Sequence, residues 1–455
     1  MQSLQPLKGL PLAQLKTRNS TKWRDFPADV LPLPVMEMDF EIAEPIRKQL
    51  IEMVSVSDTG YLGSIPEMAT NLASFAKKRW GWSVDVEGVF PATDVGVGMV
   101  EMSRMIVQPG DHILIDTPVY HNFANWINEL KCHIVNAPMK KDGLHYRLNI
   151  PLIEEAYKSG VKIHYLCNPQ NPTGTVHSRE ELAEIAELAK KYNVAIFSDE
   201  IHAPLTYKGN EFIPFLSVSE TAREVGITVT SASKAWNIAG LKCATIVVQH
   251  PKWLEIAKAM PPAVHWRASL FGALAASRAY ECADWLDACL VSLDGNRKLV
   301  EKLVSEKLPS VGYRVPDTSY VAWLDLTALN LGENPAEVLL ERGRVAFNPG
   351  VTFSPTHTQF VRMNFATKPI ENTNAGSAIL KRSNRVAWLW PKLASVTSES
   401  AHPSHITMRR RRISAGPILQ VPGIYVGSVI RERALRLRKL HCYRVHSCRA
   451  TQREI

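Results

Sequence analysis

The stretch Ile227-Thr-Val-Thr-Ser-Ala-Ser-Lys234 places a short β-branched run directly before two serines and a lysine. β-Branched residues favour strands, so we expect a strand that ends where the polar residues begin. A lysine at such a strand end can form an imine with a carbonyl cofactor, and burial would lower its pKa and favour the reactive amine. Taken by itself, the stretch is equally compatible with a surface lysine in a loop.

Two further polar motifs follow apolar runs earlier in the chain. Asn168-Pro-Gln-Asn-Pro-Thr-Gly174 comes after Ile163–Cys167, and Ser198-Asp-Glu-Ile-His202 comes after the next such run. Open α/β sheets bind ligands beyond the carboxyl ends of their strands. Asn171 could donate a hydrogen bond to a ligand oxygen, and Asp199 could hold a positively charged ring nitrogen. A plain strand-to-helix turn and a helix cap are the alternative explanations.

Strand-like and helix-like patterns alternate through the middle of the chain. The clearest helix spans Ser178–Tyr192, where Ser178 and Glu181 form a capping box. This alternation predicts a mostly parallel sheet covered by helices, followed by a smaller α+β unit. The expected strands are His112–Ile115, Ile163–Cys167, Val194–Phe197, Ile227–Thr230, Ala244–Val248, Tyr320–Leu326 and Phe360–Phe365, and further helices are expected over Ser269–Leu308 and Pro335–Gly343.

The net charge of +9 comes from the end of the chain. Residues 376–455 hold 16 Lys and Arg against 3 Asp and Glu, including four consecutive arginines at Arg409–Arg412, whereas residues 1–375 hold 37 against 41. The body is therefore slightly acidic, and nucleic-acid binding is expected, if anywhere, only through the basic tail.

Other compositional features point to a cytoplasmic protein. The seven cysteines are scattered and contain no CxxC pair, which fits reduced thiols, and no cluster has metal-ligand spacing. The first residues contain no long apolar stretch typical of a secretory signal. No run of about 18 apolar residues predicts a membrane span.

The three strand-end motifs in this order resemble the fold-type I pyridoxal 5'-phosphate (PLP) enzymes of the class I/II aminotransferase superfamily. The sequences of several segments between about Arg18 and Thr367 are similar to those of the MalY/PatB-type carbon–sulfur β-lyases, or cystathionine β-lyases. These segments are Lys22-Trp23, Met38-Asp-Phe40, Gly60-Tyr61, Thr117-Pro-Val-Tyr120, Cys167–Gly174, Ser198–Ala203, Ser231–Gly240 and Phe360–Phe365.

The resemblance implies a role for each polar residue around the cofactor ring. Lys234 would hold PLP as a Schiff base and then act as general base on the substrate. Asp199 would pair with the pyridinium nitrogen, and Asn171 would hydrogen-bond the ring hydroxyl oxygen. His202 would lie near that oxygen. Tyr120 would stack on the ring, with a core aromatic as the alternative.

The resemblance also implies a phosphate site, a substrate clamp and a partner subunit. Thr93-Asp-Val-Gly-Val-Gly98 precedes a helical run, so backbone N–H groups at a helix N-terminus would bind the phosphate. Arg362 would clamp the substrate α-carboxylate. Tyr61 would reach the phosphate of the neighbouring subunit in a homodimer. The phosphate ligands within the chain would be Gly96, Val97, Ser231 and Lys242.

Several positions depart from the lyase pattern. The phosphate loop reads Asp-Val-Gly-Val-Gly rather than Pro-Gly-Val-Val, which leaves backbone donation possible. Pro34-Val-Met-Glu-Met38 replaces the usual Trp-Val-Ala-Asp-Met, and Ser354 replaces a glycine. The last two departures bear on the substrate. The family's closing helix after Arg362 gives way to the basic tail.

The expected function is therefore PLP-dependent α,β-elimination of L-cystathionine or a related cysteine S-conjugate to a thiol, pyruvate and ammonia. An aminotransferase is the first alternative, because it uses the same residues. A regulatory binding protein built on the PLP fold is the second. The expected organisation is an N-terminal arm that includes part of the small domain (1–42), a large PLP-binding domain (43–268), a small domain (269–370) and a poorly ordered basic tail (371–455).

Overall fold

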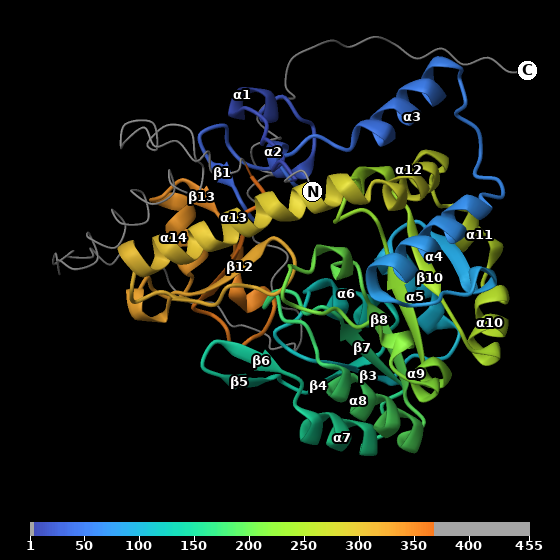
Figure 1. The fold of residues 1–455 in the computed structure, drawn as a ribbon. Coiled ribbons are helices and arrows are strands. Elements are labelled where there is room, and N and C mark those ends of the chain that lie inside the picture. Colours follow the sequence, from blue (N-terminus) through green and yellow to red (C-terminus); the bar gives the residue numbers. More distant parts are fainter. Residues whose placement is uncertain (1–3, 368–455) are drawn as a thin grey trace, which may run out of the picture. The chain divides into compact units, whose positions relative to one another are not determined.

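A seven-stranded sheet forms the centre of the computed structural model, which describes residues 4–367 (Figure 1). Its strand order is β2-β10-β9-β8-β7-β3-β4. β10 is antiparallel to β2 and β9, and every neighbouring pair from β9 to β4 is parallel. This sheet confirms the predicted α/β class. The strands are β2 (Val89–Ala92), β3 (His112–Ile115), β4 (His133–Asn136), β7 (Ile163–Cys167), β8 (Ala195–Asp199), β9 (Gly226–Thr230) and β10 (Ala244–Val247).

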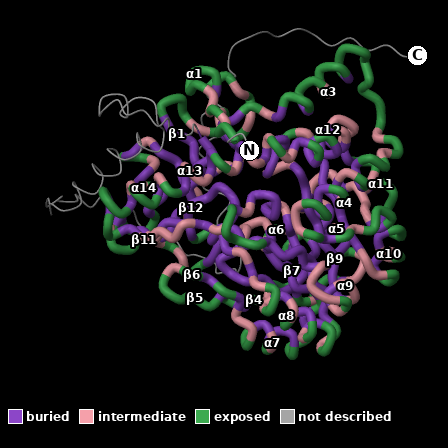
Figure 2. Tube along the Cα trace, in the orientation of Figure 1, coloured by how far each residue is buried: buried purple, intermediate pink, exposed green. Residues whose placement is uncertain are grey.

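Helices cover both faces of this sheet because its strands alternate apolar side chains between two cores. On β7, Tyr165 belongs to one apolar cluster and Leu166 to the other. Buried strand segments and exposed outer helix surfaces are visible in Figure 2. One layer contains α5 (Val95–Arg104), α6 (Asn122–Glu129) and α10 (Pro251–Lys258), and the other contains α7 (Ile150–Lys158), α8 (Arg179–Tyr192), α9 (Glu220–Val225) and α12 (Leu270–Glu281).

The predicted capping box of α8 is confirmed. The Ser178 hydroxyl accepts the N–H of Glu181 at 3.2 Å, and the Glu181 carboxylate accepts the N–H of Ser178 at 2.9 Å. Two backbone donors that the helix leaves free are thereby bound. The cap holds α8 at the end of the turn that carries Asn171.

A second, four-stranded antiparallel sheet has the order β11-β12-β15-β14. The expected strands Tyr320–Leu326 and Phe360–Phe365 correspond to β12 and β15. The central strand β15 carries Arg362, which pairs in register with Trp323 and Asn348. The elements of this part are β11 (Gly312–Tyr313), β12 (Val321–Asp325), β14 (Asn348–Pro349), β15 (Phe360–Asn364) and the helix α14 (Pro335–Glu341).

The N-terminal segment joins this second part rather than standing apart. After α1 (Leu12–Leu15) and α2 (Thr21–Arg24), β1 (Leu31–Pro32) pairs in parallel with β13 (Val345–Ala346). Residues 34–38, here called the strap, follow directly. Asn364 donates from Nδ2 to the carbonyls of strap residues 35 and 37 at 2.7 and 2.8 Å. The strap is thus tied to the end of β15.

The long helical stretch expected over Ser269–Leu308 is present and is interrupted at one residue. The structure has two helices, α12 and α13 (Ala283–Lys307), which are separated at Cys282 with φ −91° and ψ 48°. The carbonyl of Cys282 accepts the indole N–H of Trp236 at 3.2 Å. A tertiary hydrogen bond at the junction has no local pattern in the sequence.

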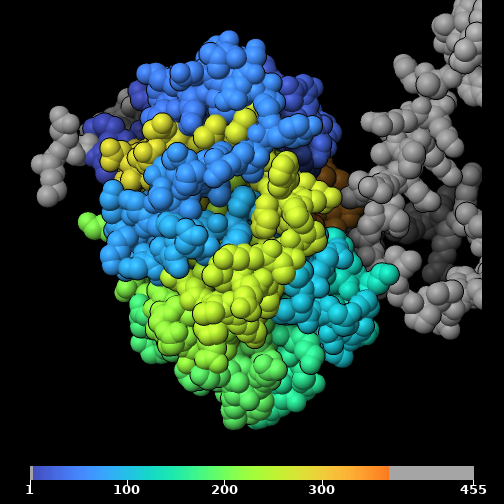
Figure 3. All heavy atoms as spheres, turned by 90° about the vertical axis from the view of Figure 1, so that its right-hand side faces the viewer, coloured from blue at the N-terminus to red at the C-terminus, as the bar shows by residue number. Residues whose placement is uncertain are grey.

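The remaining helices gather on one face of the molecule. Figure 3 turns this face toward the viewer, with the N-terminal helices in blue against yellow-green segments. These helices are α3 (Glu44–Ser55), α4 (Pro66–Trp80) and α11 (Pro262–Trp266), and a hairpin elsewhere joins β5 (Lys140–Asp142) and β6 (His145–Arg147). Among the helices of residues 4–367, none has the combination of length and apolar composition that a membrane span requires.

The basic tail lies outside the described residues. The proposed boundaries at residues 43, 269 and 371 remain predictions.

Candidate active site

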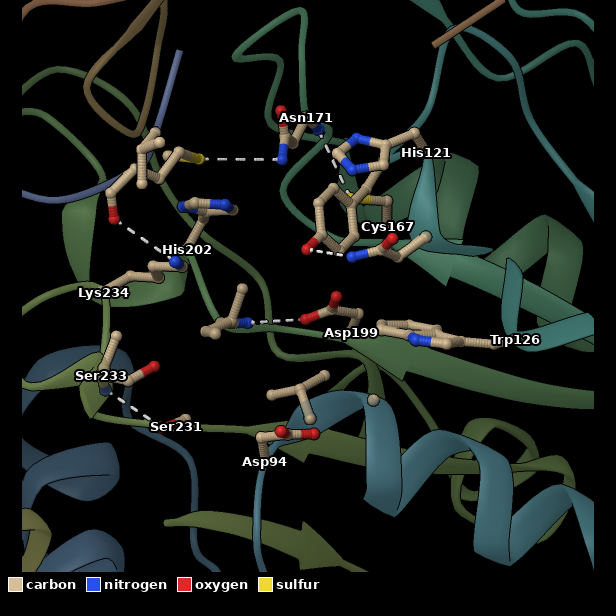
Figure 4. A pocket seen from close by; sticks show the side chains of 18 of the residues that line it. Asp94, His121, Trp126, Cys167, Asn171, Asp199, His202, Ser231, Ser233 and Lys234 are labelled. Atoms are coloured by element: carbon tan, nitrogen blue, oxygen red, sulfur yellow. Dashed lines mark hydrogen bonds between the residues drawn. The ribbon is translucent and has the colours of Figure 1, made fainter. Parts of the chain in front are cut away.

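A cavity of about 520 Å³ opens where the carboxyl ends of β7, β8 and β9 meet the strap and β15 (Figure 4). Its volume is in the range typical of small-molecule sites. The register places Cys167, Asp199 and Val229 side by side on three neighbouring strands. The predicted residues that line this cavity are Gly96, Tyr120, Asn171, Asp199, His202, Ser231, Lys234, Lys242 and Arg362.

Lys234 lines the cavity and is partly buried. Its ammonium donates to the Met36 carbonyl of the strap at 3.3 Å. Burial, with the nearby charge of Arg362, lowers the pKa of Lys234 to about 8. An amine with this pKa is partly unprotonated near neutral pH, as a nucleophile or a general base requires.

Asp199 ends β8 beneath the same cavity. One carboxylate oxygen accepts the N–H of Ile201 at 3.1 Å. Burial raises the pKa of Asp199 to about 7, and the positive charge of Lys234 opposes this rise. A cationic group placed beside this carboxylate would stabilise its ionised form.

Arg362 and Asn171 contact each other in the wall of the cavity. Arg362 donates from Nη1 to Asn171 Oδ1 at 3.0 Å and from Nη2 to the Pro34 carbonyl at 2.9 Å. Its guanidinium carbon lies 4.8 Å from the centre of the Phe353 ring. Within residues 4–367 it forms no ion pair, and its buried Nε has no hydrogen-bond partner. A buried cation without a carboxylate partner is suited to bind an anionic ligand.

His202 remains neutral in this wall. Burial, with the charges of Lys234 and Arg362, lowers the pKa of His202 to about 3. Its Nδ1 lies 3.2 Å from the Ser319 hydroxyl. A neutral imidazole can both donate and accept a hydrogen bond.

Tyr120 also lines the cavity. Its hydroxyl accepts the Asn122 amide at 2.7 Å, and burial raises the pKa of Tyr120. The ring therefore stays neutral and offers an apolar face to a ligand.

The first turn of α5 carries a carboxylate beside a cation. Asp94 accepts the N–H of Val97 at 2.9 Å with one oxygen and lies 3.2 Å from Lys242 Nζ with the other. The hydroxyl of Ser231 donates to the Cys243 carbonyl at 2.6 Å. Gly96, in the same turn, lines the cavity.

Two predicted residues are not part of the cavity wall. Val97 does not line it, and its N–H is bound to Asp94. Tyr61 is 92% exposed on the surface of the chain. All the other predicted site residues line the cavity.

Several wall residues were missed from the sequence, including Met36, Asp94, His121 and Trp126. Asp94 had a usable signal, because an Asp directly before a helical run is a typical N-cap. His121 is partly buried, and burial, with the charge of Arg362, lowers its pKa to about 4. Its Nδ1 has no partner among residues 4–367. Met36, His121 and Trp126 depend on long-range packing and carry no local pattern.

Comparison with known proteins gives this cavity its context. The model of the aminotransferase class I and II family matches residues 28–379. The chain belongs to this family. Within residues 4–367, no group of three or more His, Cys, Asp or Glu could hold a metal ion.

Relatives that are 31–38% identical over most of the chain are named cystathionine beta-lyases, whereas aminotransferases matched over a similar length are 24–27% identical. A cystathionine beta-lyase of Corynebacterium glutamicum is 34% identical over 358 residues, which cover 78% of this chain and 94% of the relative. Cystathionine beta-lyase PatB of Bacillus subtilis is 31% identical over 350 residues, covering 74% and 88%. The crystal structure of cystalysin from Treponema denticola, which contains PLP, has a TM-score of 0.78 at 23% identity and covers 87% of this chain and 98% of that one. The sequence-based assignment to the MalY/PatB-type branch is confirmed.

Proposed function

We propose that this protein is a PLP-dependent carbon–sulfur β-lyase that acts on L-cystathionine or a related cysteine S-conjugate. One observation carries the cofactor assignment: a partly buried lysine with a lowered pKa shares a cavity with a buried aspartate and a buried arginine that forms no ion pair within residues 4–367. The lyase outcome is supported by the relatives of 31% identity or more that cover most of the chain.

The polar groups of the cavity fit this cofactor. Asp199 is buried at the strand end, where a ring nitrogen cation would offset the penalty that raises its pKa. Among the described residues, the amide nitrogen of Asn171 contacts only the Met36 sulfur, at 4.0 Å, so it can donate a hydrogen bond to a ring oxygen. Gly96 and Lys242 offer a backbone N–H and a cation for the phosphate.

Bound PLP supplies an electron sink for the pair left on Cα when a proton is removed. Lys234 would hold the cofactor, and its Nζ is the group that would take the Cα proton of the substrate. Asp199 would stabilise a positive charge on the ring nitrogen. Arg362 fixes the substrate carboxylate, which orients the Cα–H bond toward Lys234.

The overall elimination breaks the Cβ–S bond and consumes one water. The thiol leaves with the sulfur, and the remaining carbon skeleton becomes pyruvate and ammonia. Strap residues 34–36 and His202 line the cavity beside Lys234 and would help to limit the access of bulk water to the base.

An assay of products separates this activity from transamination. We expect the purified protein to release pyruvate and free thiol from L-cystathionine without any keto-acid acceptor. Turnover that depends on an acceptor and releases no thiol would instead identify an aminotransferase. A protein that remains colourless with added PLP would contradict the cofactor assignment itself.

We also propose that the protein acts as a homodimer. Tyr61 is exposed, and apolar side chains on and just after α3 share its exposure: Ile51 is 62%, Val54 61% and Val56 69% exposed. Such a cluster is typical of a protein interface. Tyr61 would then reach the phosphate site of the partner subunit. Light scattering should give twice the mass of the chain, and a mass of one chain would contradict this proposal.

The compartment and the tail complete the proposal. The five described cysteines are all buried and free, which supports a reducing compartment, and we propose the cytoplasm. Nucleic-acid binding through residues 376–455 is tested by DNA retention that is lost at high salt and on deletion of these residues.

A further inference from the structure

Trp126 of α6 packs directly against the first turn of α5. A Cβ atom added to Gly96 would lie 2.7, 2.8 and 2.9 Å from Cζ2, Cε2 and Nε1 of the indole. Real Cβ atoms do not approach other atoms so closely. Glycine at position 96 therefore lets the nitrogen-bearing edge of the indole reach the start of the helix.

The indole has a free donor at the cavity. Trp126 lines the cavity, and Figure 4 draws its ring among the side chains of the cavity wall. Tyr120 packs edge-on against it, with ring centres 5.9 Å apart, so the ring is held in place. Its Nε1 makes no hydrogen bond to any of residues 4–367 and is not among their buried unpaired atoms. The N–H is thus available to a ligand.

Several polar groups around the first turn of α5 are already engaged and are less available to donate hydrogen bonds to a phosphate. The Val97 N–H is bound to Asp94, and the Ser231 hydroxyl is bound to the Cys243 carbonyl. Lys242 is shared with the Asp94 carboxylate, whose charge opposes a phosphate dianion. A rigid neutral donor next to Gly96 would offset this unfavourable charge.

We propose that the indole N–H of Trp126 is a further hydrogen-bond donor to the phosphate of bound PLP, and that Gly96 is glycine because it admits the indole. This proposal rests on the proposed function, since it requires PLP in the cavity. It assigns Trp126 to the phosphate end of the cofactor rather than to the core of the protein.

The test compares PLP with pyridoxal, which lacks the phosphate. The cofactor-free Trp126→Phe variant keeps an aromatic ring but loses the N–H. Because hydrogen bonds to charged groups are strong, we expect its dissociation constant for PLP to rise about tenfold or more. Its constant for pyridoxal should change less than about twofold, which also shows that the variant is folded. Titration followed by visible absorbance measures both constants.

A second substitution tests the packing half of the proposal. Gly96→Ala pushes the indole away and should weaken PLP binding in the wild-type background. In the Trp126→Phe background the same change should have a much smaller effect, because the displaced N–H is already gone. Trp266→Phe, at a residue that is 68% exposed, is the matched control and should leave both constants unchanged.

Two results would overturn the inference. One is a Trp126→Phe variant that binds PLP as tightly as the wild type, and the other is an equal loss for PLP and pyridoxal. If Trp126→Phe does not fold, Trp126→His, which retains a ring N–H, takes its place. Losses of PLP affinity that are fully additive between Gly96→Ala and Trp126→His would then also overturn the inference. A wild-type protein that binds neither compound would contradict the proposed function instead.

Discussion

The cavity has two sides that are built in different ways. The sheet side consists of Asn171, Asp199 and Lys234, which follow three neighbouring strands in one continuous register. The strap side consists of residues 34–38, His121 and Arg362, which are drawn together by bonds between distant segments. A single parallel sheet therefore positions the groups proposed to bind the cofactor, whereas those proposed to bind the substrate come from a second sheet and from loops that are joined to it across the cavity. The proposed cofactor-binding residues depend on the central sheet, so residues of the strap side can change the substrate preference without altering that sheet.

The largest effect is expected on the sheet side. Lys234→Ala should abolish the protein-bound visible absorbance band of PLP and reduce thiol release by about 10³-fold or more, because it removes both the attachment point and the base. Absorbance after desalting and a thiol assay measure these changes. Lys242→Ala is the matched control and should keep the band at saturating PLP. A Lys234→Ala protein that keeps the visible band and the activity would show that Lys234 is neither the attachment point nor the base.

A smaller effect, confined to the substrate, is expected on the strap side. Arg362→Lys keeps a charge but cannot donate to a carboxylate in the bidentate manner of arginine. We expect KM for L-cystathionine to rise about tenfold to a hundredfold while the absorbance of bound PLP stays the same. Steady-state kinetics and the spectrum test both halves. Loss of the cofactor band with an unchanged KM would show that the two sides are not separate.

His121 should produce a still smaller change. Its unpaired Nδ1 can find a partner in a substrate oxygen, so His121→Phe should raise KM roughly threefold to tenfold, as the loss of a neutral hydrogen bond does. His121→Asn retains a polar group and should restore part of the loss. If Phe and Asn behave alike, the ring acts only by packing against Phe353.

The last effect concerns stability rather than the reaction. Burial raises the pKa of Glu200, below the sheet side, to about 8, whereas an unfolded glutamate titrates near pH 4.3. Between these values the folded state keeps a proton that the unfolded state has lost, so stability falls as pH rises. In Glu200→Gln, urea unfolding of the cofactor-free protein between pH 5 and 8 should show a shallower fall. An identical slope would place the titration elsewhere, for example at Asp199.

The same contrast explains what could be predicted from the sequence. Asn171, Asp199 and Lys234 each follow a recognisable strand, so their meeting at one sheet edge followed from local patterns and parallel order. Arg362 was reached only through family resemblance, because its strand belongs to another sheet. Met36 stood out only as part of the segment Pro34–Met38, which departs from the lyase pattern. Trp126 gave no signal, since its position depends on packing between separate segments of the chain. The break at Cys282 was missed for the same reason.

The strap also sets the order in which the site can be completed during synthesis. Pro34 accepts its hydrogen bond from Arg362, a residue 328 positions later. A ribosome releases the N-terminal residues first, and the strands that hold the strap emerge much later. The sheet side can therefore form early in synthesis, but the cavity closes over Lys234 only after β15 (Phe360–Asn364) has been made. The strap thus waits for its partners during the synthesis of more than 300 residues, as the separation of 328 positions between Pro34 and Arg362 requires.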